Sequence, residues 1–127
     1  PDELLVEIAF PEMPKHTGWA FMEIARRSGD YAMAGVAALL TLKGDKIEQA
    51  KMVYLNVGDG PVEALQAQDS LQGAAPSQTT FAEAAQLAGH EDINPYGNVH
   101  ASPEYQRHLV NVLTQRALAK ALERATN

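Results

Sequence analysis

The residues best suited to chemistry are few and widely spaced. The chain has four histidines, at His16, His90, His100 and His108. Two helical metal ligands would normally lie four residues apart, whereas His100 and His108 flank a helix start, so surface or capping roles are favoured. With no cysteine, the chain cannot supply a disulfide framework, a thiolate zinc site, an iron–sulfur cluster or a cysteine nucleophile. The sequence therefore predicts no catalytic residue and no metal ligand.

Two polar segments resemble sites but have simpler interpretations. Residues 58–61 (GDGP) stand where a strand leads into an expected helix, a position that suits a phosphate. Asp59 would repel an anion and Pro61 lacks a backbone donor, so a tight turn is favoured. In residues 26–31 (RRSGDY), adjacent arginines on a strand must face opposite ways. Asp30 is the nearest partner for a buried arginine, and a structural turn held by an Arg26–Asp30 pair is favoured.

Trp19 is the only tryptophan of the chain. A lone tryptophan is more often a core residue than a platform for a cofactor. Gly18 precedes it and, having no side chain, would let another backbone or a ring approach closely.

Composition limits the classes of function. The 127 residues include 10 Lys and Arg against 16 Asp and Glu, a net charge of −6, which does not favour a nucleic-acid or anionic-membrane surface. A content of 46% hydrophobic and 20% charged residues is typical of one globular domain. No apolar run approaches the roughly 20 residues of a membrane span, and Asp2 and Glu3 have the wrong charge for a signal peptide. The chain is expected to be soluble and cytoplasmic.

The first half of the chain has the pattern of strands. Apolar residues alternate over residues 4–10, and residues 19–26 form a second strand candidate with Trp19 and Phe21 on one face. The Gly44-Asp45 pair predicts a hairpin turn between strands 36–42 and 47–57.

The second half has helical patterns. Gly60-Pro61 is expected to start a helix that ends at Gly73. A capping box at residues 80–83 (TFAE) is expected to start a helix that ends at Gly89. Ser102-Pro103 is expected to start the last helix, whose buried stripe is Leu109, Leu113, Ala117, Ala121 and Ala125. The prediction is an α+β fold over residues 1–127, with a small antiparallel sheet of three to four strands followed by three helices packed on one face.

Four motifs in order resemble one known family. They are residues 20–32 (AFMEIARRSGDYA), 35–38 (GVAA), 57–62 (VGDGPV) and 100–105 (HASPEY). Together they resemble the C-terminal domain of the FAD-binding medium subunit of molybdenum hydroxylases, the carbon monoxide dehydrogenase and xanthine dehydrogenase family. The glycine-rich loops of that subunit's N-terminal FAD-binding domain are absent, so the chain resembles a C-terminal fragment.

The resemblance implies an electron-transfer role within a multi-subunit oxidoreductase. In that family substrate is hydroxylated at a molybdopterin in a large subunit, and electrons pass through [2Fe–2S] clusters in a small subunit to FAD. This chain is expected to pack beside the flavin and at subunit interfaces, and to be inactive alone. Carried over by sequence position, the resemblance implies that Trp19 and Met22 lie near the flavin ring. Met22 stands where the xanthine-oxidising branch has a lysine, which suggests another substrate.

A second hypothesis remains open. The same fold could serve as a free-standing protein–protein interaction module with no redox role, and a reading frame that begins close to Pro1 would favour it. A stand-alone hydrolase lacks any nucleophile–base arrangement in the sequence.

Overall fold

One antiparallel sheet is formed by four strands of the first half of the chain. In the computed structural model, which describes residues 2–127, the strands are β1 (Thr17–Ile24), β2 (Ala34–Lys43), β3 (Lys46–Leu55) and β4 (Val62–Glu63). They are hydrogen-bonded in the order β1-β2-β3-β4. The expected hairpin is confirmed, since β2 and β3 pair from Gly35 with Leu55 to Lys43 with Lys46. Gly44 in its loop has a φ of 64°, a value that glycine adopts without strain.

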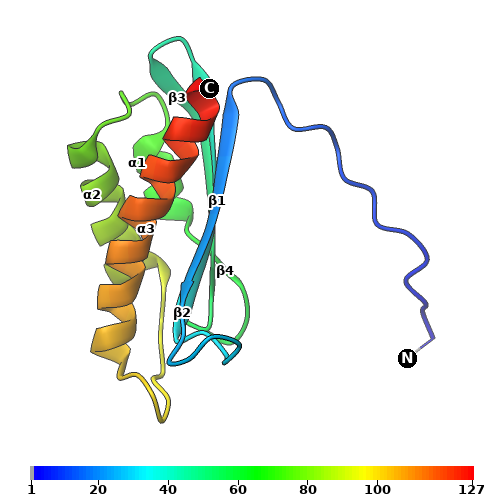
Figure 1. The fold of residues 1–127 in the computed structure, drawn as a ribbon, viewed down its shortest axis with the longest axis vertical. Helices are drawn as coiled ribbons and strands as arrows, with labels where there is room; N and C mark the ends of the chain where they lie inside the picture. Colours follow the sequence, from blue (N-terminus) through cyan, green and yellow to red (C-terminus); the bar gives the residue numbers. More distant parts are fainter. Residues whose placement is uncertain (1) are drawn as a thin grey trace.

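Helices of the second half cover one face of this sheet (Figure 1). They are α1 (Leu65–Leu71), α2 (Gln78–Leu87), the π-helical turn η1 (Ala88–Asp92) and α3 (Pro103–Thr126). The long helix α3 lies across β1 and β2, α2 packs beside α3, and α1 packs against α2 and β3. The α+β prediction, with a four-stranded sheet and three α-helices on one face, is thus confirmed. No helix among residues 2–127 has the length and hydropathy that crossing a bilayer requires.

The core lies between the sheet and α3. The inner sheet face is lined by fully buried residues such as Val36, Leu40, Met52 and Tyr54. The expected stripe of α3 packs on them: Leu109, Leu113, Ala117, Ala121 and Ala125 are all buried. The Tyr54 hydroxyl lies 2.6 Å from the hydroxyl of Thr114 on α3, and its burial raises the pKa of Tyr54 far above its ordinary value.

Two of the expected helix starts are wrong. Gly60-Pro61 leads into the short strand β4 and not into a helix, and α1 begins at Leu65. Its first turn is capped from a distance, because Asp92 accepts hydrogen bonds from the backbone N–H groups of Gln66 and Ala67, both at 3.0 Å.

The second wrong start is that of α2. The expected capping box places it at Thr80, but Ser77 is the N-cap and accepts from the Thr80 N–H at 3.1 Å. The same helix passes without a break into η1, so Gly89 does not end it.

Residues 2–16 form an extended arm that leaves the body of the domain (Figure 1). The expected strand over residues 4–10 is therefore wrong in this structure. Its apolar side chains are exposed, with Leu4 at 84%, Val6 at 86% and Phe10 at 87%. Alternation alone does not make a strand, because a strand needs a neighbour for its backbone hydrogen bonds.

Candidate functional site

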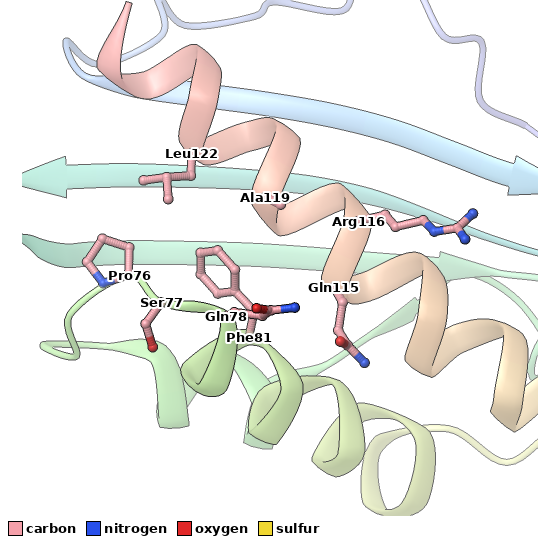
Figure 2. A pocket seen from close by; sticks show the side chains of 8 residues that line it. All are labelled: Pro76, Ser77, Gln78, Phe81, Gln115, Arg116, Ala119 and Leu122. Carbon is pink, nitrogen blue, oxygen red and sulfur yellow. The ribbon is translucent and has the colours of Figure 1, made fainter.

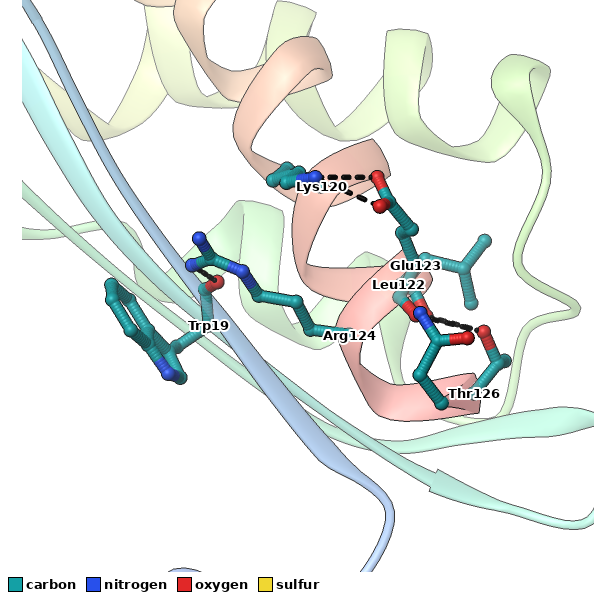
Figure 3. A network of polar contacts seen from close by, with 7 residues as sticks. Trp19, Lys120, Leu122, Glu123, Arg124 and Thr126 are labelled. Atoms are coloured by element: carbon teal, nitrogen blue, oxygen red, sulfur yellow. Dashed lines mark hydrogen bonds and ion pairs between the residues drawn. The ribbon is translucent and has the colours of Figure 1, made fainter.

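Trp19 lies on the edge strand β1 and points away from the helices. Its side chain is 48% exposed, so it is not the core residue that a lone tryptophan usually is. The Arg124 guanidinium lies over the ring, 4.1 Å from its centroid. The same guanidinium donates a hydrogen bond to the Trp19 carbonyl oxygen at 2.6 Å, as Figure 3 shows. The end of α3 therefore fixes the ring in place.

Gly18 allows this close approach of α3 to β1. A Cβ at Gly18 would lie 1.8 Å from the Ala121 carbonyl oxygen and 2.6 Å from the Ala125 nitrogen. The expectation that Gly18 admits another backbone is confirmed, and that backbone belongs to α3.

Met22 lies on the opposite face of β1 from Trp19. It pairs with Val36 on the inner face and packs, half-buried, against the core. The two residues that the sequence places near a flavin are thus on one strand but not on one surface. No strand within residues 2–127 pairs with the other side of β1, so the free edge of β1 is the place that lies near both side chains.

The sheet face turned away from the helices carries an apolar patch around Trp19. We call it the outer patch: Trp19, Phe21, Ala37, Leu39 and Val53. The register brings its members together, since Trp19 pairs with Leu39, and Phe21 with Ala37, which pairs with Val53. Three of them are well exposed, Trp19 at 48%, Phe21 at 54% and Leu39 at 38%. Contiguous exposed apolar side chains of this kind are a candidate interaction surface.

The turn after β1 is held differently from the expectation. Both Arg26 and Arg27 are exposed, and no Arg26–Asp30 ion pair occurs among residues 2–127. Arg26 instead lies 3.1 Å from Nδ1 of His100, 74 residues further on. The turn itself is confirmed, closed by a backbone hydrogen bond from Asp30 to Arg27 at 3.1 Å.

Residues 58–61, expected to be a tight turn, form a bend that no backbone hydrogen bond closes among the described residues. It connects β3 to β4, so no helix N-terminus faces it and the phosphate interpretation loses its basis. A side-chain hydrogen bond to Asp59 raises the pKa of the exposed Tyr96 above its ordinary value.

An open groove of about 530 Å³ lies between α3 and the start of α2, and Trp19 is not among its lining residues (Figure 2). Phe81, Ala119 and Leu122 give it an apolar floor, with Gln115 and Arg116 at its side. Elsewhere, no group of three His, Asp or Glu side chains within residues 2–127 could hold a metal ion.

Replacement of Arg124 tests the hold of α3 on Trp19. We expect Arg124→Met to shift the Trp19 fluorescence to the red and to cost about 0.5–1 kcal/mol of unfolding free energy, typical of an exposed cation–π pair. Trp19 is the only tryptophan, so the emission reports on this site alone. Arg116→Met, an exposed arginine on the same helix, is the control and should leave the emission unchanged. An unshifted emission in Arg124→Met would contradict the contact.

Sequence reasoning did not identify Arg124 as the partner of Trp19. It lies 105 residues from Trp19, and its only sequence signal is a place in the last turn of a helix, where any cation is favoured. The outer patch could have been found by pairing the alternate residues of the expected strands, once their register was known.

Known proteins match this chain over nearly all of its length. Residues 19–121 match the family described as CO dehydrogenase flavoprotein C-terminal domain. The 6-hydroxypseudooxynicotine dehydrogenase complex subunit alpha of Paenarthrobacter nicotinovorans is 36% identical over 98% of this chain and 42% of its own length. The carbon monoxide dehydrogenase medium chain of Afipia carboxidovorans is 34% identical over 100% of this chain and 44% of its own.

A solved structure matches the fold equally well. It is a carbon monoxide dehydrogenase from Hydrogenophaga pseudoflava that lacks the Mo-pyranopterin moiety of its molybdenum cofactor. The two superpose with a TM-score of 0.85 and 26% identity, over 90% of this chain and 39% of that one. The chain thus spans less than half the length of these relatives. The family match, the relatives and the shared fold agree, and the chain belongs to the CO dehydrogenase flavoprotein C-terminal domain family.

Proposed function

We propose that this chain is the C-terminal domain of the FAD-containing medium subunit of a molybdenum hydroxylase. The family match over residues 19–121 carries the proposal, because that family is described as part of a flavoprotein. The matched relatives are subunits of dehydrogenases and extend over more than twice the matched length. In this proposal residues 1–127 form one domain, and an N-terminal FAD-binding domain of the same subunit precedes it.

Trp19 has two features that suit a place beside a flavin. A planar ring system favours an aromatic neighbour, and Trp19 presents a half-exposed ring that Arg124 holds in one orientation. A guanidinium covers one side of that ring, which leaves its other side for a second planar group.

Met22 fits the same group only in one arrangement. It faces the helices while Trp19 faces away from them, so a flavin that touched both would lie along the free edge of β1. An apolar thioether at this place supplies no charge to a flavin, consistent with a substrate other than xanthine.

The chemistry belongs to groups outside this chain. FAD, held mainly by the N-terminal domain, would accept electrons from [2Fe–2S] clusters of a small subunit after hydroxylation at the molybdopterin of a large subunit. The part of this chain would be to orient the flavin through Trp19. The apolar outer patch gives a surface for contact with the rest of the complex, and the net charge of −6 gives no reason to invoke nucleic acid or a membrane.

An FAD titration tests this proposal. We expect the 127-residue chain to show no saturable quenching of Trp19 fluorescence, and the full-length medium subunit to bind FAD. In the full-length subunit, Trp19→Leu should weaken FAD binding by roughly 3- to 10-fold, the effect of losing one aromatic contact.

The control is Tyr105→Leu, which removes an aromatic ring 44% exposed at the opposite end of α3. It should leave FAD binding unchanged. A full-length subunit that binds no FAD would refute the proposal, and saturable FAD binding by the 127-residue chain would show that the chain is a flavin site in its own right. A Trp19→Leu subunit with unaltered affinity would remove Trp19 from the site.

A further inference from the structure

The arm that precedes β1 has the pattern of a strand without a sheet. Leu4, Val6, Ile8 and Phe10 alternate with Leu5, Glu7 and Ala9, a period of two residues that places one apolar row on one side. Soluble chains rarely expose so many large apolar side chains in one short segment.

Within the described residues this segment meets no partner. Leu4, Leu5, Val6, Ile8 and Phe10 are between 62% and 87% exposed. No backbone hydrogen bond joins residues 4–10 to any of the described strands. Both the side chains and the backbone groups of the arm are therefore available for pairing.

The connection to β1 keeps the arm away from its own sheet. Pro11 and Pro14 cannot donate backbone hydrogen bonds, which ends any ladder after Phe10. His16 then adopts a φ of 56°, a value rare for a residue with a side chain, while its carbonyl accepts from the Leu42 N–H at 3.0 Å. The sheet is thus anchored from His16 onward, and the arm before it is directed outward (Figure 1).

We propose that residues 3–10 form a β-strand in the sheet of the domain that precedes this one in the full-length subunit, so that the arm ties the two domains together. This rests on the proposed function, which supplies that domain. The preceding domain is the expected partner of the arm for two reasons. The relatives continue for more than half of their length beyond the match, and the matched family is a C-terminal domain. The arm before β1 is then the segment that connects this domain to the preceding one.

Strand addition of this kind has two components. Main-chain hydrogen bonds to an open sheet edge supply affinity, and alternate side chains supply specificity. The row Leu4, Val6, Ile8 and Phe10 would face the core of the preceding domain, and Glu7 would face solvent. The outer patch lies on the side of the sheet toward which the arm extends, so the same domain would cover that patch.

Hydrogen exchange followed by mass spectrometry tests the inference. In the full-length subunit, backbone amides of residues 4–10 should exchange on the order of 100-fold more slowly than in an unstructured chain, as in other paired strands. In the 127-residue chain the same amides should exchange at the unstructured rate. FAD content is measured separately, so a flavin-free subunit with a protected arm would refute the proposed function and still support the strand.

Proline substitutions supply the matched pair. In the full-length subunit, Ile8→Pro should abolish protection over residues 4–10, while Met13→Pro, in the segment that already contains Pro11 and Pro14, should leave it intact. Exchange at the unstructured rate in the full-length wild type would overturn the proposal. Protection of residues 4–10 in the 127-residue chain would also overturn the proposal. Protection that rises with protein concentration would show that the arm pairs with a second copy of the chain. Protection independent of concentration would show that the arm folds back on its own sheet.

Discussion

Gly18→Ala is expected to lower the free energy of unfolding by about 3 kcal/mol or more, the upper range for overpacking a well-filled site. The added methyl group would meet backbone and not a flexible side chain, with the Ala121 carbonyl oxygen at 1.8 Å and the Ala125 nitrogen at 2.6 Å. Either α3 must move away from β1 or β1 must bend. Both changes would separate Arg124 from Trp19.

Denaturant unfolding followed by Trp19 fluorescence measures this effect. Gly60→Ala is the matched control, because a Cβ there meets nothing within 4 Å and Gly60 is not among the glycines of positive φ. It should change the unfolding free energy by less than about 0.5 kcal/mol. Equal stability of the Gly18→Ala and Gly60→Ala chains would show that α3 does not approach β1 as described.

Gln106→Leu is expected to cost about 2–4 kcal/mol of unfolding free energy, because it removes three hydrogen bonds that a buried side chain makes to the backbone of other segments. The Gln106 amide nitrogen donates to the carbonyls of Met33 at 3.0 Å and of Asn56 at 2.8 Å, and its oxygen accepts from the Gly97 N–H at 3.1 Å. Gln106 is only 2% exposed, so its side-chain amide depends on these protein partners. One residue of α3 thereby holds the β1–β2 loop, the end of β3 and the segment before α3.

Thermal and denaturant unfolding of Gln106→Leu give the measurement, and Gln86→Leu gives the control. Gln86 is exposed on α2, so the same change in a helix should alter stability by no more than about 0.5 kcal/mol. None of the groups that bond to Gln106 titrates. The loss of unfolding free energy should therefore be equal at pH 6 and pH 9, within about the experimental error. A loss that matched the control would mean that the three contacts contribute nothing.

The elements that could be predicted from the sequence are those fixed by local chemistry. Gly44-Asp45 determines the hairpin because it supplies the positive φ that a two-residue loop needs. Ser102-Pro103 determines the start of α3 because an N-cap oxygen and a proline both favour that position. The stripe from Leu109 to Ala125 follows from helical periodicity.

The elements that were missed depend on distant parts of the chain. The cap of α1 comes from Asp92, 26 residues beyond Gln66. The partner of Arg26 is His100, 74 residues further along the chain. Short-range patterns contain no information on such pairs. Residues 4–10 failed for a related reason: the pattern of a strand is present, but its neighbour is not among the residues described.

The same limit applies to the candidate site. Trp19 could be singled out because it is the only tryptophan, and its implied place near a flavin remains a prediction. Its exposure and its Arg124 partner required the register of the sheet and the packing of α3. Met22 is a different case: a strand reverses its side-chain direction at each residue, so the expected strand by itself already puts positions 19 and 22 on opposite faces.

The packing of α3 on β1 has a consequence for synthesis of the protein on the ribosome. Arg124, which bonds to the Trp19 carbonyl, is synthesised 105 residues after Trp19. At typical translation rates the synthesis of these residues takes roughly 5 to 20 s. During that interval the strands can pair, but the inner face of β1 has no helix to cover it. A nascent chain paused before its last helix would therefore expose this face of the sheet, and chaperones that bind apolar surfaces should associate with it at that stage.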